Sequence, residues 1–557
     1  MDYEKLADTY EKLEKTSAKL GKRDILAELI KKAPEDDLDK VALLITGRVF
    51  PVSAQEELGI ASKMMMRAIS KSTGFPEKNI VKEFKESGDL GIVAEKLVKS
   101  KRQSILMKRE LTVDHVFKNL RKLPDITGTG SQDRKLNIIA ELVSSAKPKE
   151  ARYIVRTALG TLRIGVAEGI LRDAIAEAFD VDAKAVEYAW NMLPDYGEIV
   201  KIAKTKGNKG LKNVKVKVGV SVQVLLAEKA PDLKTALKKF KRVVIEVKYD
   251  GARVQIHKDG DKIKLFTRRL EDVTKQFPDL VKMSKQSIKS GKCILDGEII
   301  GIDKKTGKSL PFQQLSQRIQ RKYDIEKMVK ELPIQVNLFD MIYCDDKMLF
   351  NLPFIERRKL LEKSIKPVPN KFQLAKQFVT NDLKEAEKFY KEVLKSGEEG
   401  VMVKNLDSKY QPGRRVGYWL KVKPIMEPLD LVVIGAEWGT GKRANWLSSY
   451  ILACRDTKTG DYLHCGMMGT GLTDEQFKEM TKRLQPLIIK ESGRTVKIKP
   501  EVVIEVGYEE IQRSPKYKSG FALRFPRMLR DRSMEKSPED VDTLERVKKL
   551  YKLQRGR

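Results

Sequence analysis

The stretch Val243–His257 reads VVIEVKYDGARVQIH, and it decides how the middle of the chain folds. Every second residue from position 243 to 247 is apolar, which is the period-two pattern of a half-buried β-strand. Glu246 and Lys248 therefore share the other face of that strand. Asp250 and Gly251 supply a tight turn, after which the alternation resumes. The pattern predicts two strands joined by a short turn, with a carboxylate and an amine on one face.

Lys248 is the residue of this stretch with the clearest chemical use. It ends a strand beside a tight turn, where packing can hold its side chain. A lysine that is fixed near another cation and partly removed from water can present a neutral amine, which is a nucleophile. The alternative, which this stretch alone leaves open, is a lysine at a solvated strand end.

The segment that contains Lys248 is the first of several sequence motifs along the chain. Lys248–Arg253, KYDGAR, resembles motif I (KxDGxR) of the covalent nucleotidyltransferases. Within that superfamily the chain is most similar to the ATP-dependent DNA ligases of the archaeal and eukaryotic replicative type, over nearly its full length. The other motifs follow in the superfamily's order: Ia at Thr267-Arg268, III at Leu295–Glu298, IIIa at Asn337–Asp340, IV at Glu399–Lys404, V at Trp419–Lys423 and VI at Arg524–Arg527.

Length and composition restrict the class of protein. The chain has 557 residues, too many for one core, which predicts about three to four domains. Its formal net charge of +32 points to a polyanionic partner such as nucleic acid, although a ribosomal or chromatin protein would share that charge. No apolar run suits a membrane span or a signal peptide, so we expect a soluble, cytoplasmic protein with no membrane partner. Its four cysteines lack CxxC spacing, which suits neither a zinc site nor a disulfide framework.

The hydrophobic pattern predicts a multidomain fold in three parts. Residues 1–214 show helical spacing and predict an all-α domain, which the resemblance identifies as DNA-binding. Residues 215–424 switch to short alternating strands with a few helices and predict an α+β domain, which the resemblance identifies as the nucleotidyltransferase (adenylation) domain. Residues 425–557 show strands separated by turn residues and then a charged tail, which predicts a five-stranded OB-fold β-barrel with a C-terminal helix. The lysine-rich stretch Lys201–Gly219 is typical of a linker or surface loop.

Three arginines in the first part are candidates for DNA contacts. Arg152, Arg156 and Arg163 lie in ARYIVRTALGTLRIGVAEG, which resembles a segment of the DNA-binding domain of these ligases. Contacts to phosphates position a protein without reading sequence, which suits an enzyme that acts at any nick. The alternative that stays open is that these arginines pair with acidic neighbours on a solvated helix.

A short segment is a candidate for binding the replication sliding clamp. Gln103–Met107, QSILM, lies where family members carry a peptide of the form Q-x-x-hydrophobic-aromatic. Met107 replaces the aromatic residue that usually fills the partner's pocket. The clamp is kept as a candidate partner, with a plain exposed loop as the alternative.

The resemblance implies an ATP-dependent DNA ligase that seals nicks in duplex DNA in three steps. Lys248 attacks the α-phosphorus of ATP to form lysyl-AMP, AMP passes to the 5′-phosphate at the nick, and the 3′-hydroxyl then displaces AMP to form the phosphodiester. It also implies service in DNA replication, repair and recombination. The expected partner is nicked double-stranded DNA, and the expected state is a monomer.

The same resemblance implies roles for residues around the nucleotide. Phe339 stacks on the adenine, although without its motif an ordinary core aromatic is the alternative. Cations are needed because the polyphosphate charge must be spread in the transition state. The implied set is Glu246 for the adenine amine, Arg253 near the sugar, Glu298 for the ribose, Arg268 and Arg415 for phosphates, Lys421 and Lys423 for the α-phosphate, and Arg524 and Arg527 for the leaving pyrophosphate.

A divalent cation is implied as well. Mg²⁺, with Mn²⁺ as a substitute, takes oxygen ligands and keeps several waters, so one or two carboxylates plus substrate phosphates suffice. Glu399 resembles the family's metal-binding glutamate. Glu298 and Asp250 are the neighbouring candidates.

Rival interpretations come from the same superfamily and from a different class. An RNA ligase or an mRNA capping guanylyltransferase would share motifs I to V, but the long helical N-terminal region and motif VI as RFPR resemble DNA ligases better. An NAD-dependent ligase would be expected to carry a cysteine-rich zinc module. A non-catalytic DNA clamp would be expected to lose the motif lysines, whereas Lys248, Lys421 and Lys423 are all present.

Overall fold

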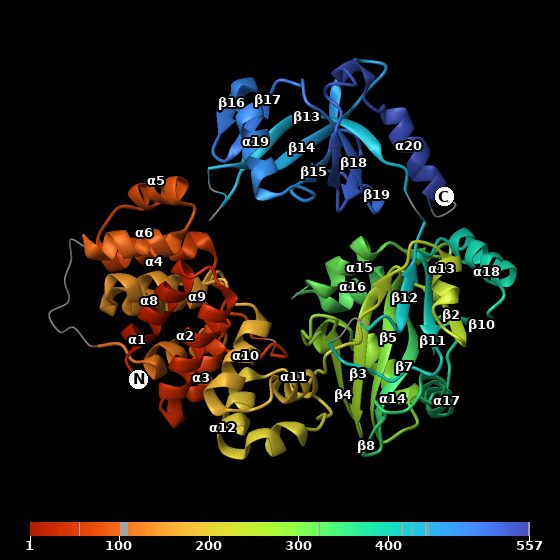
Figure 1. The fold of residues 1–557 in the computed structure, drawn as a ribbon, viewed down its shortest axis with the longest axis horizontal. Coiled ribbons are helices and arrows are strands. Elements are labelled where there is room, and N and C mark those ends of the chain that lie inside the picture. Colours follow the sequence, from red (N-terminus) through yellow and green to blue (C-terminus); the bar gives the residue numbers. More distant parts are fainter. Residues whose placement is uncertain are drawn as a thin grey trace. The chain divides into compact units, whose positions relative to one another are not determined.

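The structure is a computed structural model that describes residues 1–54, 56–100, 110–321, 323–413, 416–424, 426–440, 443 and 445–554. Figure 1 shows the elements of the chain, which divides into two compact units. One unit comprises Met1–Ile80, Leu90–Val393 and Glu398–Val422, and the other comprises Lys423–Arg557 with the short segments Val81–Asp89 and Leu394–Gly397. Within the described ranges, each helix is too short or too polar to serve as a transmembrane span.

Helices form the first part of the chain, as its periodicity predicts. In α1, Leu6, Tyr10 and Leu13 recur at helical spacing, and all three are fully buried. Tyr10 packs edge-to-face on Tyr153 of α9, with the ring centroids 5.1 Å apart. The helices are α1 (Tyr3–Lys15), α2 (Lys19–Lys32), α3 (Glu35–Ile45), α4 (Ser62–Thr73), α5 (Glu77–Ser87), α6 (Leu90–Lys99), α7 (Val113–Lys122), α8 (Ser131–Ser145), α9 (Pro148–Ala158), α10 (Glu168–Phe179), α11 (Ala183–Met192) and α12 (Tyr196–Lys212).

The stretch Lys201–Gly219 is not the linker that its lysines suggested. Its residues up to Lys212 belong to α12, which buries an apolar face that includes Ile199. Lysine has good helix propensity, so one apolar face is enough to dock a lysine-rich helix. Gly207 alone departs from helical geometry, with φ 54° and ψ −152°, and kinks the helix. The loop prediction is correct only for residues 213–219.

Two β-sheets form the middle of the chain. One has five strands in the order β1-β12-β11-β2-β10, and the other has seven strands on the path β4-β3-β5-β7-β8, with β6 beside β5 and β9 beside β7. The strands are β1 (Glu228–Lys229), β2 (Val243–Lys248), β3 (Ala252–Asp259), β4 (Lys262–Thr267), β5 (Lys292–Ile302), β6 (Ser309–Leu310), β7 (Ile334–Cys344), β8 (Lys347–Met348), β9 (Phe372–Leu374), β10 (Gln377–Val379), β11 (Gly400–Asn405) and β12 (Trp419–Val422). The helices are α13 (Leu233–Lys238), the 3₁₀ turn η1 (Thr274–Gln276), α14 (Pro278–Ser287), α15 (Phe312–Ile319), α16 (Ile325–Glu331), α17 (Phe354–Ser364) and α18 (Leu383–Lys395).

The strand β2 is buried on both faces, so the prediction of a half-buried strand is wrong. It lies between β11 and β10, and side chains of the other sheet pack against its polar face. The turn at Asp250 leads into β3, which belongs to the seven-stranded sheet, so β2 and β3 do not pair. A Cβ on Gly251 would lie 2.2 Å from the Ile299 carbonyl oxygen, so only glycine fits where the chain crosses between the sheets.

The second unit is rich in strands. Its sheet follows the path β15-β14-β13-β17-β16, with β18 paired to β13 and β21, and β19 pairs separately with β20. The sheet has seven strands rather than the five predicted, and the OB-fold assignment stays a prediction. The elements are β13 (Leu429–Trp438), β14 (Leu447–Arg455), β15 (Tyr462–Met468), α19 (Asp474–Leu484), η3 (Gln485–Leu487), β16 (Ile488–Ser492), β17 (Thr495–Ile498), β18 (Val503–Gly507), β19 (Glu510–Arg513), β20 (Phe521–Arg524), β21 (Arg527–Asp531), η4 (Pro538–Asp540) and the predicted terminal helix α20 (Leu544–Leu553).

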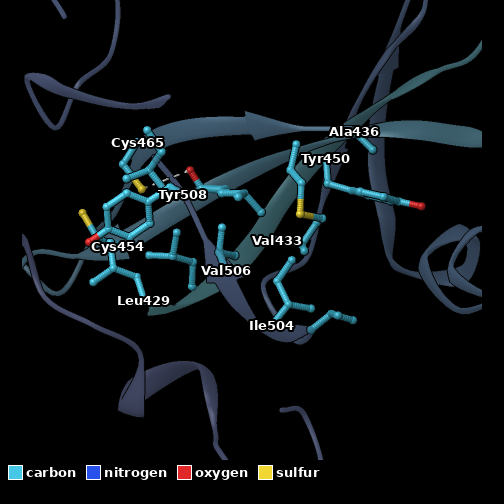
Figure 2. Packing of buried hydrophobic residues seen from close by; sticks show 14 of the residues in the cluster. Leu429, Val433, Ala436, Tyr450, Cys454, Cys465, Ile504, Val506 and Tyr508 are labelled. Carbon is cyan, nitrogen blue, oxygen red and sulfur yellow. Dashed lines mark hydrogen bonds between the residues drawn. The ribbon is translucent and has the colours of Figure 1, made fainter. Parts of the chain in front are cut away.

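The core of this second unit is shown in Figure 2. Leu429 and Val433 of β13 pack with Val506 of β18, all fully buried. Cys454 and Cys465 lie in the same cluster as free thiols. This core is continuous from the sheet to α20, which contributes buried residues to it. The two domain borders, after residues 214 and 424, remain predictions.

Candidate active site

Neighbouring strands place side chains of motifs I, IV and V on one face of the five-stranded sheet. Glu246 of β2 lies opposite Met402 of β11, which lies opposite Lys421 of β12. Lys248 lies opposite Gly400. Partners across antiparallel strands share a face. The side chains of Glu246, Lys248 and Lys421 therefore emerge on the same side of the sheet, while its other face carries valines that pack into a hydrophobic cluster.

Lys248 is held in place by Glu399. Its Nζ donates a hydrogen bond to Oε2 of Glu399, and the two side chains are 21% and 14% exposed. The Glu399 amide also donates to the Lys248 carbonyl at 3.1 Å, so backbone and side chain both join these residues. Gly400, across the strand pair from Lys248, has no side chain to crowd the amine. The result is an amine with a fixed position and limited access to water.

Glu298 adds a second carboxyl group from the seven-stranded sheet. It lies on β5, directly opposite Arg253 of β3. Burial raises the pKa of the Glu298 carboxyl to about 8, and the positive charges of Lys248 and Arg253 work against that rise. The charge of Glu399 adds to the rise. The two sheets thus bring the motif I lysine and the carboxyl groups of motifs III and IV within electrostatic range of one another.

A pH dependence of stability follows from Glu298. Its folded-state pKa of about 8 exceeds the ordinary value of 4.5, so the folded protein binds this proton more tightly than the unfolded chain does. The resulting stabilisation is fully present below pH 4.5 and is lost as the pH rises through 8. We expect the metal-free protein to lose free energy of unfolding across this window relative to Glu298→Gln, which cannot titrate. Urea unfolding in EDTA at several pH values measures the difference, and parallel profiles would contradict it.

Arg253 is anchored in the wall of the site. Its guanidinium donates to both carboxylate oxygens of Asp296, at 2.9 and 2.5 Å, and to the Leu225 carbonyl at 2.6 Å. The Tyr410 hydroxyl donates to the same carboxylate at 2.9 Å. Burial acts to lower the pKa of Arg253, but the Asp296 carboxylate holds it above its ordinary value. The guanidinium also lies 5.4 Å from the centroid of the Phe339 ring.

Phe339 belongs to an aromatic cage around Lys404. The Phe339 side chain is mostly buried and meets Trp419 edge-to-face, with the centroids 5.8 Å apart. Nζ of Lys404 lies 4.4 Å from the Phe339 centroid and 4.1 Å from that of Trp419. It also lies 2.5 Å from Oε2 of Glu246. Sequence reasoning assigned no role to Lys404, although strand alternation from Met402 places it on the face of Glu246 and would have been the signal.

Other phosphate-binding candidates lie in the second unit. There Lys423 forms an ion pair with Glu509 at 3.2 Å, and Arg524 forms one with Glu510 at 3.4 Å. Arg527 is exposed at the start of β21. Lys423 and Arg524 thus pair with carboxylates of the second unit in this structure. The resemblance implies that both residues bind phosphates of the nucleotide.

Two further candidates for phosphate binding, Arg268 and Arg415, lie outside the second unit. Arg268 is exposed just after β4. Arg415 lies outside the described residues, as does the clamp-binding candidate Gln103–Met107. The roles assigned to Arg268, Arg415 and Gln103–Met107 stay predictions.

The described residues contain no group of three or more histidine, cysteine, aspartate or glutamate side chains that could hold a metal ion. Asp250 is 5% exposed, and its Oδ2 accepts a hydrogen bond from the Phe312 amide at 3.3 Å. Glu298 and Glu399 remain as hard oxygen donors beside Lys248. Because Mg²⁺ needs only one or two carboxylates when phosphates supply the other ligands, these two residues fit the ion.

The structure favours the ion-pair alternative for two of the three arginines proposed to bind DNA. Arg156 is 2% exposed and donates to Glu14 at 3.0 Å, and Arg152 pairs with Glu14 at 3.1 Å and with Glu95 at 3.2 Å. A phosphate would have to replace these carboxylates. Arg163 is exposed on the loop between α9 and α10, with φ 57°.

Comparisons with known proteins agree along the whole chain. The family described as "DNA ligase N terminus" matches residues 2–176, "ATP dependent DNA ligase domain" matches 224–423, and "ATP dependent DNA ligase C terminal region" matches 443–534. A DNA ligase of Nanoarchaeum equitans is 49% identical over 564 residues, which cover 100% of this chain and 99% of that protein. A DNA ligase of Thermococcus fumicolans is 47% identical over 555 residues, which cover 100% and 99%. The solved structure named Pmar-Lig_PreS3 shares the fold with a TM-score of 0.57 at 18% identity, covering 94% of this chain and 99% of that one.

The fold and the site define the class first: an enzyme with a helical N-terminal domain, a central nucleotidyltransferase domain and a strand-rich C-terminal domain. The full-length identity then gives the family. The chain belongs to the ATP-dependent DNA ligases, a family that seals nicks in DNA with ATP as the adenylate donor. The resemblance drawn from the ordered motifs is thereby confirmed.

Proposed function

We propose that Lys248 is the nucleophile through which this chain seals nicks in duplex DNA. The observation that supports the assignment is the placement of its amine beside Glu399, on the sheet face shared with Glu246 and Lys421. The neutral amine attacks the α-phosphorus of ATP, a P–N bond forms, and the bond to the bridging oxygen breaks so that pyrophosphate leaves. Two protons pass to water, to which 21% of the side chain is exposed: one as the ammonium becomes this amine, and one as the P–N bond forms.

The surrounding residues bind and orient the nucleotide in this proposal. Phe339 offers a ring face to the adenine, Glu246 accepts from its amino group, and Glu298 accepts from the ribose. Lys421 lies on the nucleophile's face and neutralises the α-phosphate, since fixed charges in a partly dry site stabilise developing charge well. Glu298 and Glu399 would hold a Mg²⁺ ion, which would supply further neutralisation of the phosphates.

The DNA steps are the finer part of the proposal. AMP passes from Lys248 to the 5′-phosphate of a nick, and the 3′-hydroxyl then attacks that phosphorus and releases AMP. The substrate is nicked double-stranded DNA, which the exposed Arg163 and the net charge of +32 support. A monomer that works in the cell's interior, with the sliding clamp as a recruiting partner through Gln103–Met107, completes the proposal.

The test is a two-part assay on the full chain. Incubation with α-labelled ATP and a divalent ion, followed by denaturing electrophoresis, is expected to leave label on the protein. A nicked duplex is then expected to be sealed with ATP. A non-catalytic clamp would retain no label. An RNA ligase would retain label but leave the nick in duplex DNA open, so that outcome would contradict the proposal.

Replacing Arg524 is expected to separate the chemical steps. Arg524 is proposed to orient the pyrophosphate only while ATP is present, so Arg524→Ala should slow formation of lysyl-AMP by about 100-fold. Sealing of a nick that already carries AMP should remain close to that of the unchanged chain. Single-turnover assays of the two steps measure this. Arg483→Ala removes another ion-paired arginine of the same unit and serves as the matched control. Equal loss in both steps would contradict the role.

A further inference from the structure

Glu246 and Lys404 form a deeply buried ion pair on the nucleophile's face of the sheet. Oε2 of Glu246 lies 2.5 Å from Nζ of Lys404, and the two side chains are 3% and 2% exposed. Glu246 faces Met402 across the strand pair, and Lys404 lies two residues further along β11, so both side chains are on one face. The pair therefore forms where the register of β2 and β11 fixes it.

The cage around Lys404 holds its ammonium on several sides. Its Nζ lies 4.8 Å from the Phe354 centroid, in addition to the contacts with Phe339 and Trp419. Burial holds the pKa of Lys404 below its ordinary value, although the Glu246 carboxylate opposes that shift. A buried cation in such a cage is stabilised by the ring faces and by its carboxylate partner. The lysine has little freedom to move away from Glu246.

The second oxygen of Glu246 points to a ligand. Oε1 is buried and has no hydrogen-bond partner among the residues that the structure describes. Leaving a buried acceptor without a donor is costly, so such an atom is expected to receive a hydrogen bond from something that binds there. An ionised carboxylate only accepts hydrogen bonds, whereas a protonated one can also donate.

We propose that Lys404 is a positioning residue that sets the enzyme's choice of purine. It rests on the proposed function of the site. Lys404 pairs with Oε2 of Glu246 and fixes the carboxyl group, which leaves Oε1 as an acceptor for an exocyclic amino group. A 6-aminopurine nucleotide presents an N–H donor to that oxygen. A 6-oxopurine nucleotide presents a carbonyl oxygen there, and the two acceptors repel each other.

The test compares Lys404→Met, which keeps most of the side chain's length without its charge, with Lys404→Arg, which keeps the charge. The full chain is incubated with ATP or GTP, and kcat/KM for protein labelling is measured for each. We expect the ratio of the ATP value to the GTP value to fall at least about 10-fold in Lys404→Met and to be largely retained in Lys404→Arg. A purely structural role would lower kcat/KM for ATP and for GTP by the same factor. An unchanged ratio of the two values would therefore overturn the proposal.

Two further measurements keep the test decisive. Binding of ATP and GTP to the variants, measured by calorimetry without DNA, is expected to show the same loss of preference. Should Lys404→Met fail to fold, the unchanged chain is tested with the triphosphate of purine riboside, which lacks the 6-amino group. A labelling efficiency equal to that with ATP would overturn the proposal. Failure of the proposed function is a separate result, because the unchanged chain would then take no label from ATP at all.

Discussion

Replacing Lys248 with alanine is expected to reduce formation of the protein–AMP adduct by about 10⁴-fold or more, because no other group can supply the nitrogen of the covalent bond. Intact-mass measurement after incubation with ATP and Mg²⁺ should show a single added AMP on the unchanged chain and none on the variant. Peptide mapping should place the adduct in KYDGAR. The fold is expected to survive, since the side chain is partly exposed and contacts one carboxylate.

The control for this experiment depends on the structure. Lys258 is the nearest lysine on the following strand, but its buried ammonium donates to the carbonyls of Ile288 and Ser290 at 2.9 and 2.8 Å. Removing it would disturb packing. Lys262 is exposed at the start of β4, so Lys262→Ala is the better matched control and should label normally. An adduct of full yield on the Lys248→Ala chain would show that another residue carries the AMP.

Replacing Asp296 with alanine is expected to cost about 3–5 kcal/mol of free energy of unfolding, because it leaves the Arg253 guanidinium largely buried without its counter-charge. The Asp296 side chain has no exposed area and that of Arg253 is 13% exposed, so water can compensate little. The unpaired guanidinium would also leave its place beside Phe339. We therefore expect labelling by ATP to fall together with stability.

Urea unfolding followed by circular dichroism measures the loss. Tyr410→Phe removes one hydrogen bond to the same carboxylate and is expected to cost less, about 1–2 kcal/mol. Asp261→Ala, at an exposed position in the β3–β4 turn, is the matched control and should change little. If Asp296→Ala were as stable as Asp261→Ala, the network around Arg253 would have no role in holding the site.

Several parts of the site could be predicted from local pattern because strand alternation and motif order are local properties. The alternation around Lys248 placed Glu246 on its face, and the register of β2 with β11 and β12 extends that face to Lys421. The helical N-terminal part was predictable for the same reason, since Leu6, Tyr10 and Leu13 follow one helix face. The lysine-rich segment was misjudged because composition outweighed the buried face of α12.

Other features depend on which strands become neighbours, and no local pattern contains that information. Lys248 and Glu399 are 151 positions apart in the chain. The burial of both faces of β2 arises because a second sheet packs against it, which the alternation alone could not show. Arg156 looked like a phosphate contact by its spacing, yet Glu14 of α1 lies beside it once the helices pack.

The amino-acid sequence by itself determined the family, the order of its motifs, the alternation that puts an amine and a carboxylate on one strand face, and the turn at Asp250 and Gly251 that follows that strand. The tertiary structure alone decided the partners of each charge: Glu399 for Lys248, Lys404 for Glu246, and Asp296 for Arg253. The physical reason is that a buried charge is stable only beside a counter-charge, and distant segments supply that counter-charge when the sheets form.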